Sequence, residues 1–315
     1  MVDAELYLAD LEAKPEALGA LADYLDREDP FEGLPEYDRV VFLGMGSSRY
    51  AAGVAAQRLR AAGIDAVAEY ASASMGTPPS PRTLAVAISA SGGSRETLDA
   101  VSRHAGTSFV VAMTNKPGSA ITEGAGLVVP MVAGEERGSV ACRTFQHTLA
   151  LLLAFTAQAR AGDEISGLVR RAAEATADLL DRRGDWLEET ATLLDGPYGV
   201  YTIAPAERLS SAEQSALMFR EGPRRQADAC ETGDWAHVDV YLTKTYDYRA
   251  LLFPGSRYDD QAMDWIRQRG STVVTVGGDL DGQAGSVRYR HDDDPDVALL
   301  TETLVAELVA ATYWM

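Results

Sequence analysis

The chain has 315 residues, of which 46% are hydrophobic, so it is long enough for one large domain or two domains of ordinary size. Its 47 acidic and 28 basic side chains give a formal net charge of −19, which repels phosphate backbones and argues against nucleic-acid binding. The two cysteines, Cys142 and Cys230, are too few for a disulfide framework or a cysteine-rich zinc site.

Two segments bear on where the protein resides. Residues 1–18 are acidic and amphipathic, without the basic start and apolar centre of a signal peptide. The longest apolar run, residues 149–155, is much shorter than a membrane span. We therefore expect a cytoplasmic protein that has no membrane partner.

The first half alternates strand and helix patterns after a helical N-terminal segment, residues 1–36. Apolar runs that end in glycine or polar turns predict strands within residues 40–46, 65–70, 83–93, 109–119 and 126–134. Helical patterns follow at residues 47–63, 94–105 and 144–161. We assign residues 37–162 to a first domain.

The second half repeats this order after a charged helical connector, residues 163–195. Matching strand and helix patterns cover residues 198–207, 210–223, 249–270, 271–280, 286–290 and 299–315. Continuous apolar strands between helices are typical of parallel sheets with both faces covered. The sequence thus predicts an α/β protein with two doubly wound domains related by duplication, the second at residues 196–315.

Three turns of the first half are expected at one edge of its sheet, because ligands of doubly wound folds lie beyond the carboxyl ends of the strands. They are Gly44–Ser48, Ser89–Ser94 and Thr114–Asn115. In the second turn, the serine loop, three hydroxyls and two glycines open a helix, which suits an anion such as phosphate. Serine and glycine are also ordinary N-cap residues, so both interpretations stay open at this point.

These turns resemble those of the SIS (sugar isomerase) family, in particular the isomerase half of glucosamine-6-phosphate synthase and related deglycases and deaminases. The resemblance is strongest over GMGSSRYAAGVAAQRLR, AVAISASGGSRETLDAV, AMTNKPGSAI and AGEERGSVACRTFQHTLALLLA. It implies flavodoxin-like SIS domains that bind a phosphosugar. By the resemblance, the phosphate contacts fall on Ser47, Ser48, Ser89, Ser91 and Ser94, and the sugar contacts on Gly46, Glu136, Ser139 and Ala141. Ala90 stands where the family usually has glutamine.

The resemblance also implies two catalytic residues in the second half. Glu221 matches the glutamate that moves a proton between C1 and C2, and His237, after Gly233-Asp234, matches the histidine that opens the sugar ring. An aldose–ketose interconversion requires one such base and one such proton shuttle. In the family the histidine often reaches in from the neighbouring subunit, so we expect a homodimer with His237 near the partner's site.

Departures from the family leave the activity open. Gln214 and Met218 replace a glutamate and a lysine, and the C-terminal ATYWM lacks the lysine that covers the substrate in the synthase. The second-half counterpart of the serine loop, PGSRYDD, carries Asp259 and Asp260, which discourage a phosphate. We therefore expect one sugar-phosphate site per chain, with no metal and no cofactor.

Three functions remain. The first is isomerisation of an amino-sugar or fructosamine phosphate, the second is a silent sugar-phosphate sensor, and the third is release of an amine from a ketosamine phosphate. The retention of Glu221 and His237 favours an enzyme, while the loss of the lysines favours a sensor. No nucleophilic-cysteine domain precedes this region, so we expect no glutaminase activity.

Overall fold

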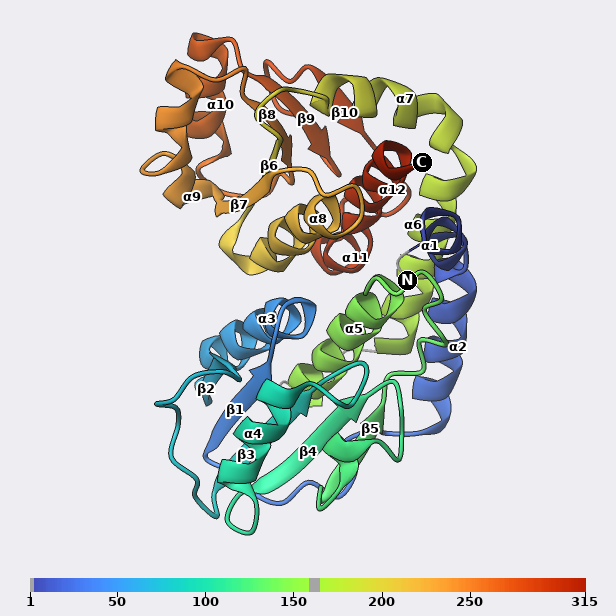
Figure 1. Cartoon of the computed structure of the whole chain (residues 1–315), viewed down its shortest axis with the longest axis vertical. Helices are drawn as coiled ribbons and strands as arrows, with labels where there is room; N and C mark the ends of the chain where they lie inside the picture. The colour runs from blue at the N-terminus through green and yellow to red at the C-terminus, as the bar shows by residue number, and fades with distance from the viewer. Residues whose placement is uncertain (1–2, 159–164) are drawn as a thin grey trace. The chain divides into compact units, whose positions relative to one another are not determined.

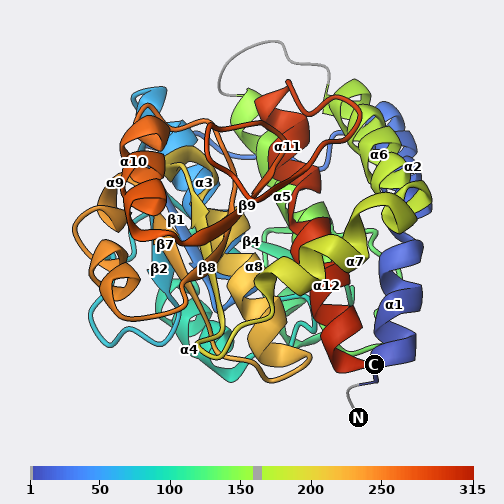
Figure 2. The same ribbon diagram turned by 90° about the horizontal axis from the view of Figure 1, so that it is seen from above.

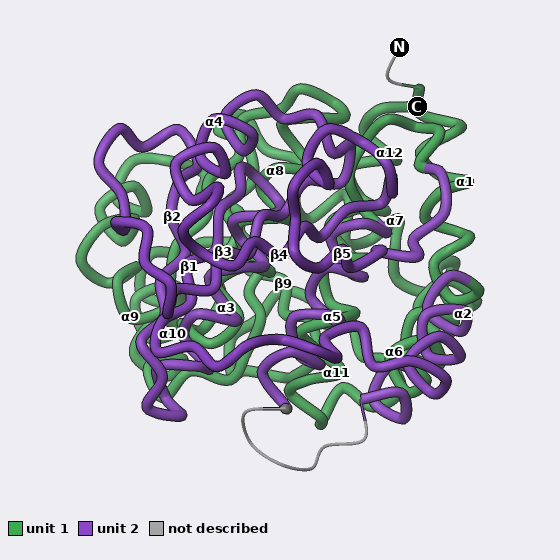
Figure 3. Tube along the Cα trace, turned by 90° about the horizontal axis from the view of Figure 1, so that it is seen from below, with its two compact units in different colours: residues 1–16, 136–142, 170–315 green, residues 17–135, 143–169 purple. Residues whose placement is uncertain are grey.

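The computed structural model describes residues 3–158 and 165–315, which form two compact units (Figures 1 and 3). Unit 1 comprises residues 1–16, 136–142 and 170–315, and unit 2 comprises residues 17–135 and 143–169. Both units contain segments that are distant in sequence. The domain boundaries expected from the sequence repeat therefore stay a prediction, and the one after residue 162 lies outside the described residues.

Unit 2 is built on a parallel five-stranded sheet with the strand order β2-β1-β3-β4-β5. Its strands are β1 (Arg39–Gly44), β2 (Asp65–Tyr70), β3 (Thr83–Ile88), β4 (Phe109–Thr114) and β5 (Leu127–Pro130). Its helices are α2 (Lys14–Arg27, which begins in unit 1), α3 (Ser47–Ala61), α4 (Arg95–His104), the short η1 (Ala120–Thr122) and α5 (Arg143–Gln158).

The central strands of this sheet are covered on both faces, as their apolar sequences predict. All six residues of β3 are buried, as are five of the six in β1. Helices α3 and α5 pack against each other, whereas α4 contacts β1, β3 and β4 through a cluster that includes Val41, Ala85 and Ala100. The predicted helix at residues 144–161 is present through Gln158, and its expected end lies outside the described residues.

Unit 1 repeats the same topology, with the strand order β10-β9-β8-β6-β7 and all pairings parallel. Its strands are β6 (Val200–Ala204), β7 (Ala227–Glu231), β8 (Arg249–Leu252), β9 (Thr272–Val276) and β10 (Gly285–Val287). Its helices are α1 (Ala4–Glu12), α6 (Ile165–Asp181, which begins in unit 2), α7 (Arg183–Leu194), η2 (Ala206–Arg208), α8 (Leu209–Glu221), α9 (Thr232–Trp235), η3 (Asp239–Lys244), α10 (Asp259–Arg269), α11 (Pro295–Thr301) and α12 (Thr303–Trp314). The shared strand order confirms the α/β fold with two doubly wound sheets.

Strand β7 is the element that the sequence pattern does not reveal. Its sequence, ADACE, carries two acids among small residues, so it lacks the apolar run of the other strands. Pairing with β6, in which Cys230 lies opposite Ile203, creates the strand. The segment before His237 is therefore a strand followed by the short helix α9.

Residues Pro295–Trp314, which comprise α11 and α12, are long and apolar enough to cross a membrane by length and composition alone. However, 83% of an apolar window of 18 residues within this stretch is buried inside the structure. Helix α12 contacts α1, α7 and α8, and Figure 2 shows α1 beside it. This packing accounts for the apolar composition, as in the core helix of a folded domain.

One ion pair lies completely inside unit 1. Lys14, the first residue of α2, pairs with Glu307 of α12, and both side chains are 0% exposed. Removal of one partner from a buried pair leaves an uncompensated charge, which costs more than the pair itself contributes.

We predict that Lys14→Met destabilises the protein by about 3–5 kcal/mol, because Glu307 would lose its counter-ion in an apolar interior, where burial already raises its pKa. The double variant Lys14→Met/Glu307→Leu should recover most of this loss, since no buried charge is then left. Urea denaturation measures both changes. Arg183→Met, which breaks the exposed pair with Glu12, is the control and should cost less than about 1 kcal/mol. A Lys14→Met variant no less stable than this control would contradict the prediction.

Candidate functional site

The turns after β1 and β3 lie at the carboxyl edge of the unit 2 sheet, where ligands bind in this topology. Strands β1 and β3 are parallel neighbours, and the chain proceeds from them in opposite directions, to β2 and to β4. The crevice at such a reversal is the usual ligand position in open α/β sheets with this strand order. The two turns carry the five predicted phosphate contacts and one predicted sugar contact: Ser47, Ser48, Ser89, Ser91, Ser94 and Gly46.

The first turn brings the backbone close to the start of α3. Gly46 is the N-cap residue, with a φ of 50° and a ψ of −129°. A methyl group on Gly44 would lie 3.0 Å from Ser48 Cβ, so the tight turn leaves little room for a side chain there. Ser47 and Ser48 are half-buried in the first turn of α3, which contains no acidic residue. This helix terminus is therefore compatible with an anion.

The serine loop is a compact turn fixed by its own hydrogen bonds. Ser89 is buried and donates its N–H to the Met113 carbonyl at 3.1 Å, and Gly92 N–H donates to the Ser89 carbonyl at 3.0 Å. Gly92 has a φ of 66°, and a side chain on it would overlap Ser119 Oγ. Ser91 is exposed, and its Oγ accepts from Gly93 N–H at 3.4 Å. The loop thus combines a left-handed glycine with an exposed hydroxyl.

Ser94 caps helix α4, so the structural role considered for this loop applies to one of its serines. Its Oγ accepts from Thr97 N–H at 3.4 Å and lies 3.2 Å from a Glu96 carboxylate oxygen. A phosphate contact by Ser94 would compete with these interactions.

Glu221 is the last residue of α8 in unit 1 and is half-buried. Burial raises the pKa of its carboxyl, and the charge of Glu136 raises this pKa further. The position at a helix C-terminus also disfavours a negative charge. A raised pKa moves a carboxyl towards the pH range in which a general acid–base group works.

The segment of residues 136–142, which we call the 136–142 loop, carries the other predicted sugar contacts of unit 1. Glu136 Oε1 accepts from Cys142 N–H at 2.8 Å, and the Ala141 carbonyl accepts from Gln214 Nε2 of α8 at 2.8 Å. Ser139 is exposed with a φ of 61°. The structure therefore places Glu136 and Ala141 beside the helix that ends at Glu221.

Cys142 is completely buried, and burial raises its pKa well above the usual value for a thiol. This environment agrees with an inert thiol.

His237 and Glu221 lie towards opposite ends of strand β7. Glu221 ends the helix that precedes the strand, and His237 follows α9 beyond its other end. A strand of five residues spans about 16 Å. His237 is exposed, and its backbone N–H donates to the Asp234 carbonyl at 2.8 Å. The topology thus separates the two predicted catalytic residues within one chain.

In the second sheet, the counterpart of the serine loop is filled by the protein's own carboxylate. Asp259 Oδ2 accepts from Gly255 N–H at 2.7 Å and from Ser256 N–H at 3.0 Å. Arg208, which follows β6, donates to the Pro254 carbonyl, and its Nε lies 3.2 Å from the buried Glu302. An internal anion therefore uses the amides that a phosphate would need, which gives the expected degeneracy of this loop a physical basis.

The remaining histidines have structural partners. His104 Nδ1 lies 3.0 Å from Ser108 Oγ, His147 Nδ1 lies 2.8 Å from the Met131 carbonyl, and His291 Nε2 lies 2.8 Å from Glu174. Within residues 3–158 and 165–315, no group of three or more histidine, cysteine or acidic side chains is arranged to hold a metal ion.

The contacts of three residues were not predicted from the sequence, although Asn115 was expected at the carboxyl edge of its sheet. Asn115 bridges two segments of unit 2, since its Nδ2 donates to the Gly134 carbonyl at 2.6 Å and its Oδ1 accepts from Ala133 N–H at 3.1 Å. Asp10 and Tyr7 of α1 contact the 136–142 loop and α8. The sequence signal for Asn115 is its position at the end of a predicted strand. The signal for α1 is an amphipathic pattern, which predicts a helix but not the segments that the helix contacts.

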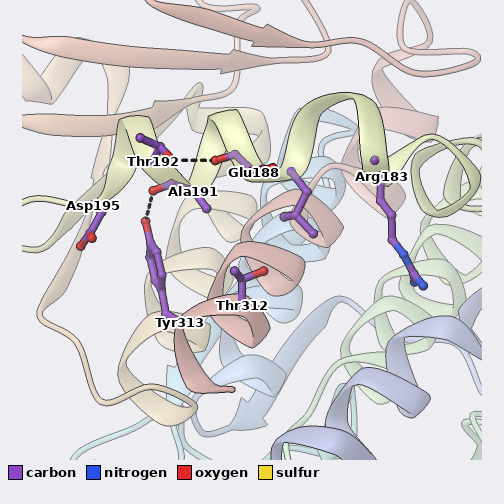
Figure 4. Close-up of a pocket in the computed structure, with 9 residues that line it drawn as sticks. Arg183, Glu188, Ala191, Thr192, Asp195, Thr312 and Tyr313 are labelled. Carbon is purple, nitrogen blue, oxygen red and sulfur yellow. Dashed lines mark hydrogen bonds between the residues drawn. The ribbon is translucent and has the colours of Figure 1, made fainter.

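A groove of about 620 Å³ in unit 1 lies between α7 and α12 (Figure 4). Its lining includes Arg183, Asp195 and Tyr313, and none of the predicted site residues. Arg183 pairs with Glu12, Asp195 pairs with Arg225, and Tyr313 Oη donates to the Ala191 carbonyl at 2.6 Å. These groups are therefore already engaged within the protein, and we assign no chemistry to the groove.

Comparison with known proteins identifies a family that part of this chain matches. Residues 34–158 match the SIS domain family. A glutamine–fructose-6-phosphate aminotransferase (isomerizing) from Zymomonas mobilis is 28% identical over 264 residues, which cover 79% of this chain and 43% of that protein. The chain spans between 28% and 43% of the length of the curated relatives that it matches.

Solved structures share the fold over nearly the whole chain. The C-terminal domain of glucosamine-fructose-6-phosphate aminotransferase from Francisella tularensis aligns with a TM-score of 0.84 at 16% identity, over 98% of this chain and 96% of that one. Tagatose-6-phosphate ketose/aldose isomerase from Escherichia coli aligns with a TM-score of 0.77 at 17% identity, over 98% and 92%.

We predict that Asp259→Ala destabilises unit 1 by about 1–3 kcal/mol, because two backbone amides lose their internal acceptor. Inorganic phosphate should restore part of this stability by binding to the vacated amides. Thermal unfolding with and without phosphate measures both effects. Asp260→Ala, at the exposed neighbouring position, is the control. If phosphate stabilises the two variants equally, Asp259 does not occupy an anion site in this loop.

A second prediction concerns pH. The pKa of Glu221 in the folded chain lies above its ordinary value of 4.5, so the folded state holds more protons than the unfolded state between these two pKa values. Stability therefore falls as pH rises through that window, and the charged carboxylate destabilises the fold at pH 8. Glu221→Gln should unfold at a higher temperature than the parent protein at pH 8, with the difference shrinking as the pH is lowered towards 4.5. Glu207→Gln, at an exposed position, should show no such trend. An equal or lower unfolding temperature for Glu221→Gln at pH 8 would refute the assignment.

Proposed function

This chain belongs to the SIS domain family, and we propose that it is a phosphosugar isomerase-type enzyme. Its substrate would be an amino-sugar phosphate or a fructosamine phosphate, and the reaction would transfer a proton between C1 and C2. We further propose that it acts as a homodimer in the cytoplasm. The fold shared with the tagatose-6-phosphate isomerase and with the synthase domain is consistent with this function.

The observation that carries the proposal is the position of the serine loop. It follows β3 at the edge where the strand order reverses, next to the turn with Ser47 and Ser48. The formal charge of −19 makes long-range attraction of a phosphate unfavourable, so the site must act locally through amides and hydroxyls. In this proposal, Ser47, Ser48, Ser89 and Ser91 donate to the phosphate oxygens, and Ser94 orients the loop through α4 or joins them.

Glu221 supplies the proton chemistry of the proposed reaction. Its ionised carboxylate removes the proton from C2 or C1 of the open-chain sugar, which leaves an enediolate, and the resulting carboxyl returns the proton to the adjacent carbon. A raised pKa suits both steps, since a group that must accept a proton and then return it works best when its pKa lies near the working pH. Glu136, whose charge raises the Glu221 pKa, is placed by the 136–142 loop near the same carboxyl.

His237 would open the sugar ring by moving a proton to the ring oxygen, as an imidazole can near neutral pH. Its exposure and its separation from Glu221 along β7 favour a role in the site of a second subunit. In that arrangement each site of the proposed homodimer combines Glu221 of one subunit with His237 of the other.

A non-catalytic sensor is the second candidate, and one contact favours it. Met218 occupies the position of the family lysine, and Tyr7 Oη lies 3.4 Å from its sulfur. A buried thioether cannot stabilise the negative charge of an enediolate as an ammonium group would. Release of an amine from a ketosamine phosphate, which uses the same Glu221 base, is the remaining alternative.

Exchange of the C1 or C2 proton with deuterated water tests the enzyme directly. The protein should incorporate deuterium at C1 of fructose 6-phosphate, the ketose, or at C2 of glucosamine 6-phosphate, the aldose, and Glu221→Gln should lower this rate by at least about 100-fold. Ser91→Ala should instead weaken binding, seen as a smaller thermal stabilisation by the same sugar phosphates. Glu207→Gln is again the matched control.

The outcomes separate the candidates. Stabilisation by a sugar phosphate without exchange selects the sensor, and release of ammonia or another amine selects the deaminase or deglycase. Exchange that persists in Glu221→Gln removes this residue from the mechanism. If none of a panel of hexose, hexosamine and fructosamine phosphates stabilises the protein, the proposed function is wrong.

A further inference from the structure

The 136–142 loop is held by the N-terminal helix α1. Asp10 Oδ2 accepts from Gly138 N–H at 2.7 Å, and Asp10 is only 4% exposed. The two residues are 128 positions apart in sequence. A buried backbone N–H that loses its acceptor costs the desolvation of that group, so this contact strongly favours one position of the loop.

The loop also approaches the backbone of α1 closely. Gly138 is buried, and a methyl group at this position would lie 2.5 Å from Tyr7 Cα and 2.7 Å from Tyr7 N. Only glycine can pack against the helix at this distance. Asp10 and Tyr7 therefore fix the middle of the loop from one side.

The two ends of the 136–142 loop are fixed by other contacts. Glu136 Oε1 binds Cys142 N–H across the loop, and Gln214 of α8 binds the Ala141 carbonyl. The loop residues predicted to meet the sugar are therefore aligned with α8 at one end and with α1 in the middle. A shift of α1 would move Ser139, which is next to Gly138, more directly than it would move Glu221.

Helix α1 is itself fixed to the core of unit 1. It lies beside α12, and the Tyr7 ring packs on the Trp314 ring with centroids 5.8 Å apart. The buried Lys14–Glu307 pair joins the start of α2, which follows α1, to α12. The support for the loop is thus continuous from α12 through α1 to Gly138.

We propose that Asp10 is a positioning residue that holds the 136–142 loop in the geometry required for contact with the sugar ring. This inference rests on the proposed function, in which Glu136, Ser139 and Ala141 contact the sugar and the predicted serines contact the phosphate. Loss of the Asp10 acceptor releases the loop, and the affinity for the sugar falls while the affinity for phosphate alone stays.

The two cysteines provide a test of the loop that requires no substrate. Cys142 closes the loop and is 0% exposed, whereas Cys230 lies in β7. In a Cys230→Ser background, the rate at which 5,5′-dithiobis(2-nitrobenzoate) modifies Cys142 reports how often the loop opens. Asp10→Ala should raise this rate by about tenfold or more, because opening no longer breaks the buried hydrogen bond.

Three matched variants are compared in that background. Asp10→Asn retains an oxygen that accepts from Gly138 N–H and should restore the slow modification rate. Glu12→Ala removes the exposed ion pair with Arg183 on the same helix and should leave the rate unchanged. By titration calorimetry, Asp10→Ala should raise the dissociation constant of fructose 6-phosphate by about tenfold while that of inorganic phosphate changes by less than about twofold.

The thiol modification rates and the binding affinities test the inference and the proposed function separately. If fructose 6-phosphate does not bind to the parent protein, the choice of sugar in the proposed function fails, whereas the thiol rates still decide whether Asp10 holds the loop. Equal thiol rates in the parent protein and Asp10→Ala would overturn the inference. A rate in Asp10→Asn as high as in Asp10→Ala would also overturn it, since the hydrogen-bond acceptor would then not be the cause. Equal loss of affinity for both ligands would show general destabilisation instead of positioning.

Discussion

The two halves of this protein differ in how the turn at the carboxyl edge of each sheet provides for a negative charge. Backbone amides at the start of a helix favour a negative charge, and burial leaves them few other acceptors. In the second sheet, Asp259 supplies that charge from within the chain. In the first sheet, the equivalent loop is built from serines and glycines, and α3 has no acid in its first turn. A single duplicated fold thus has one loop satisfied internally and one suited to an external anion.

Unit 1 also contains a carboxyl, that of Glu221, whose ionised form is destabilised by its surroundings. Glu221 ends a helix, is half-buried and lies near the charge of Glu136, and each of these factors opposes its ionisation. The surrounding elements are held by two hydrogen bonds and one buried ion pair. The hydrogen bonds join Asp10 to Gly138 and Gln214 to Ala141, and the ion pair joins Lys14 to Glu307. A rigid support of this kind is what allows a destabilised acid to persist, and it is typical of catalytic carboxyls.

The sequence predicted the architecture well, because the strands of both sheets are mostly continuous apolar runs followed by turn residues. Strand β7 could not be predicted in this way, since its alternating small and acidic residues acquire a strand conformation only by pairing with β6. The serine loop was located from its composition and order alone. The partners of Asp10 and Lys14 could not be predicted from the sequence, because they lie 128 and 293 positions away. A lysine is also usually a surface residue, so nothing in the sequence indicates that Lys14 is buried.

The proposed anion site is tested most directly by a crystal structure of the protein grown with tungstate, a heavy analogue of phosphate whose position is seen by anomalous scattering. We expect one tungstate per chain, within hydrogen-bond distance of the hydroxyls or amides of residues 89–94 and of the turn after β1. A tungstate bound instead at residues 254–260, or serine hydroxyls that contact no anion, would contradict the proposed site.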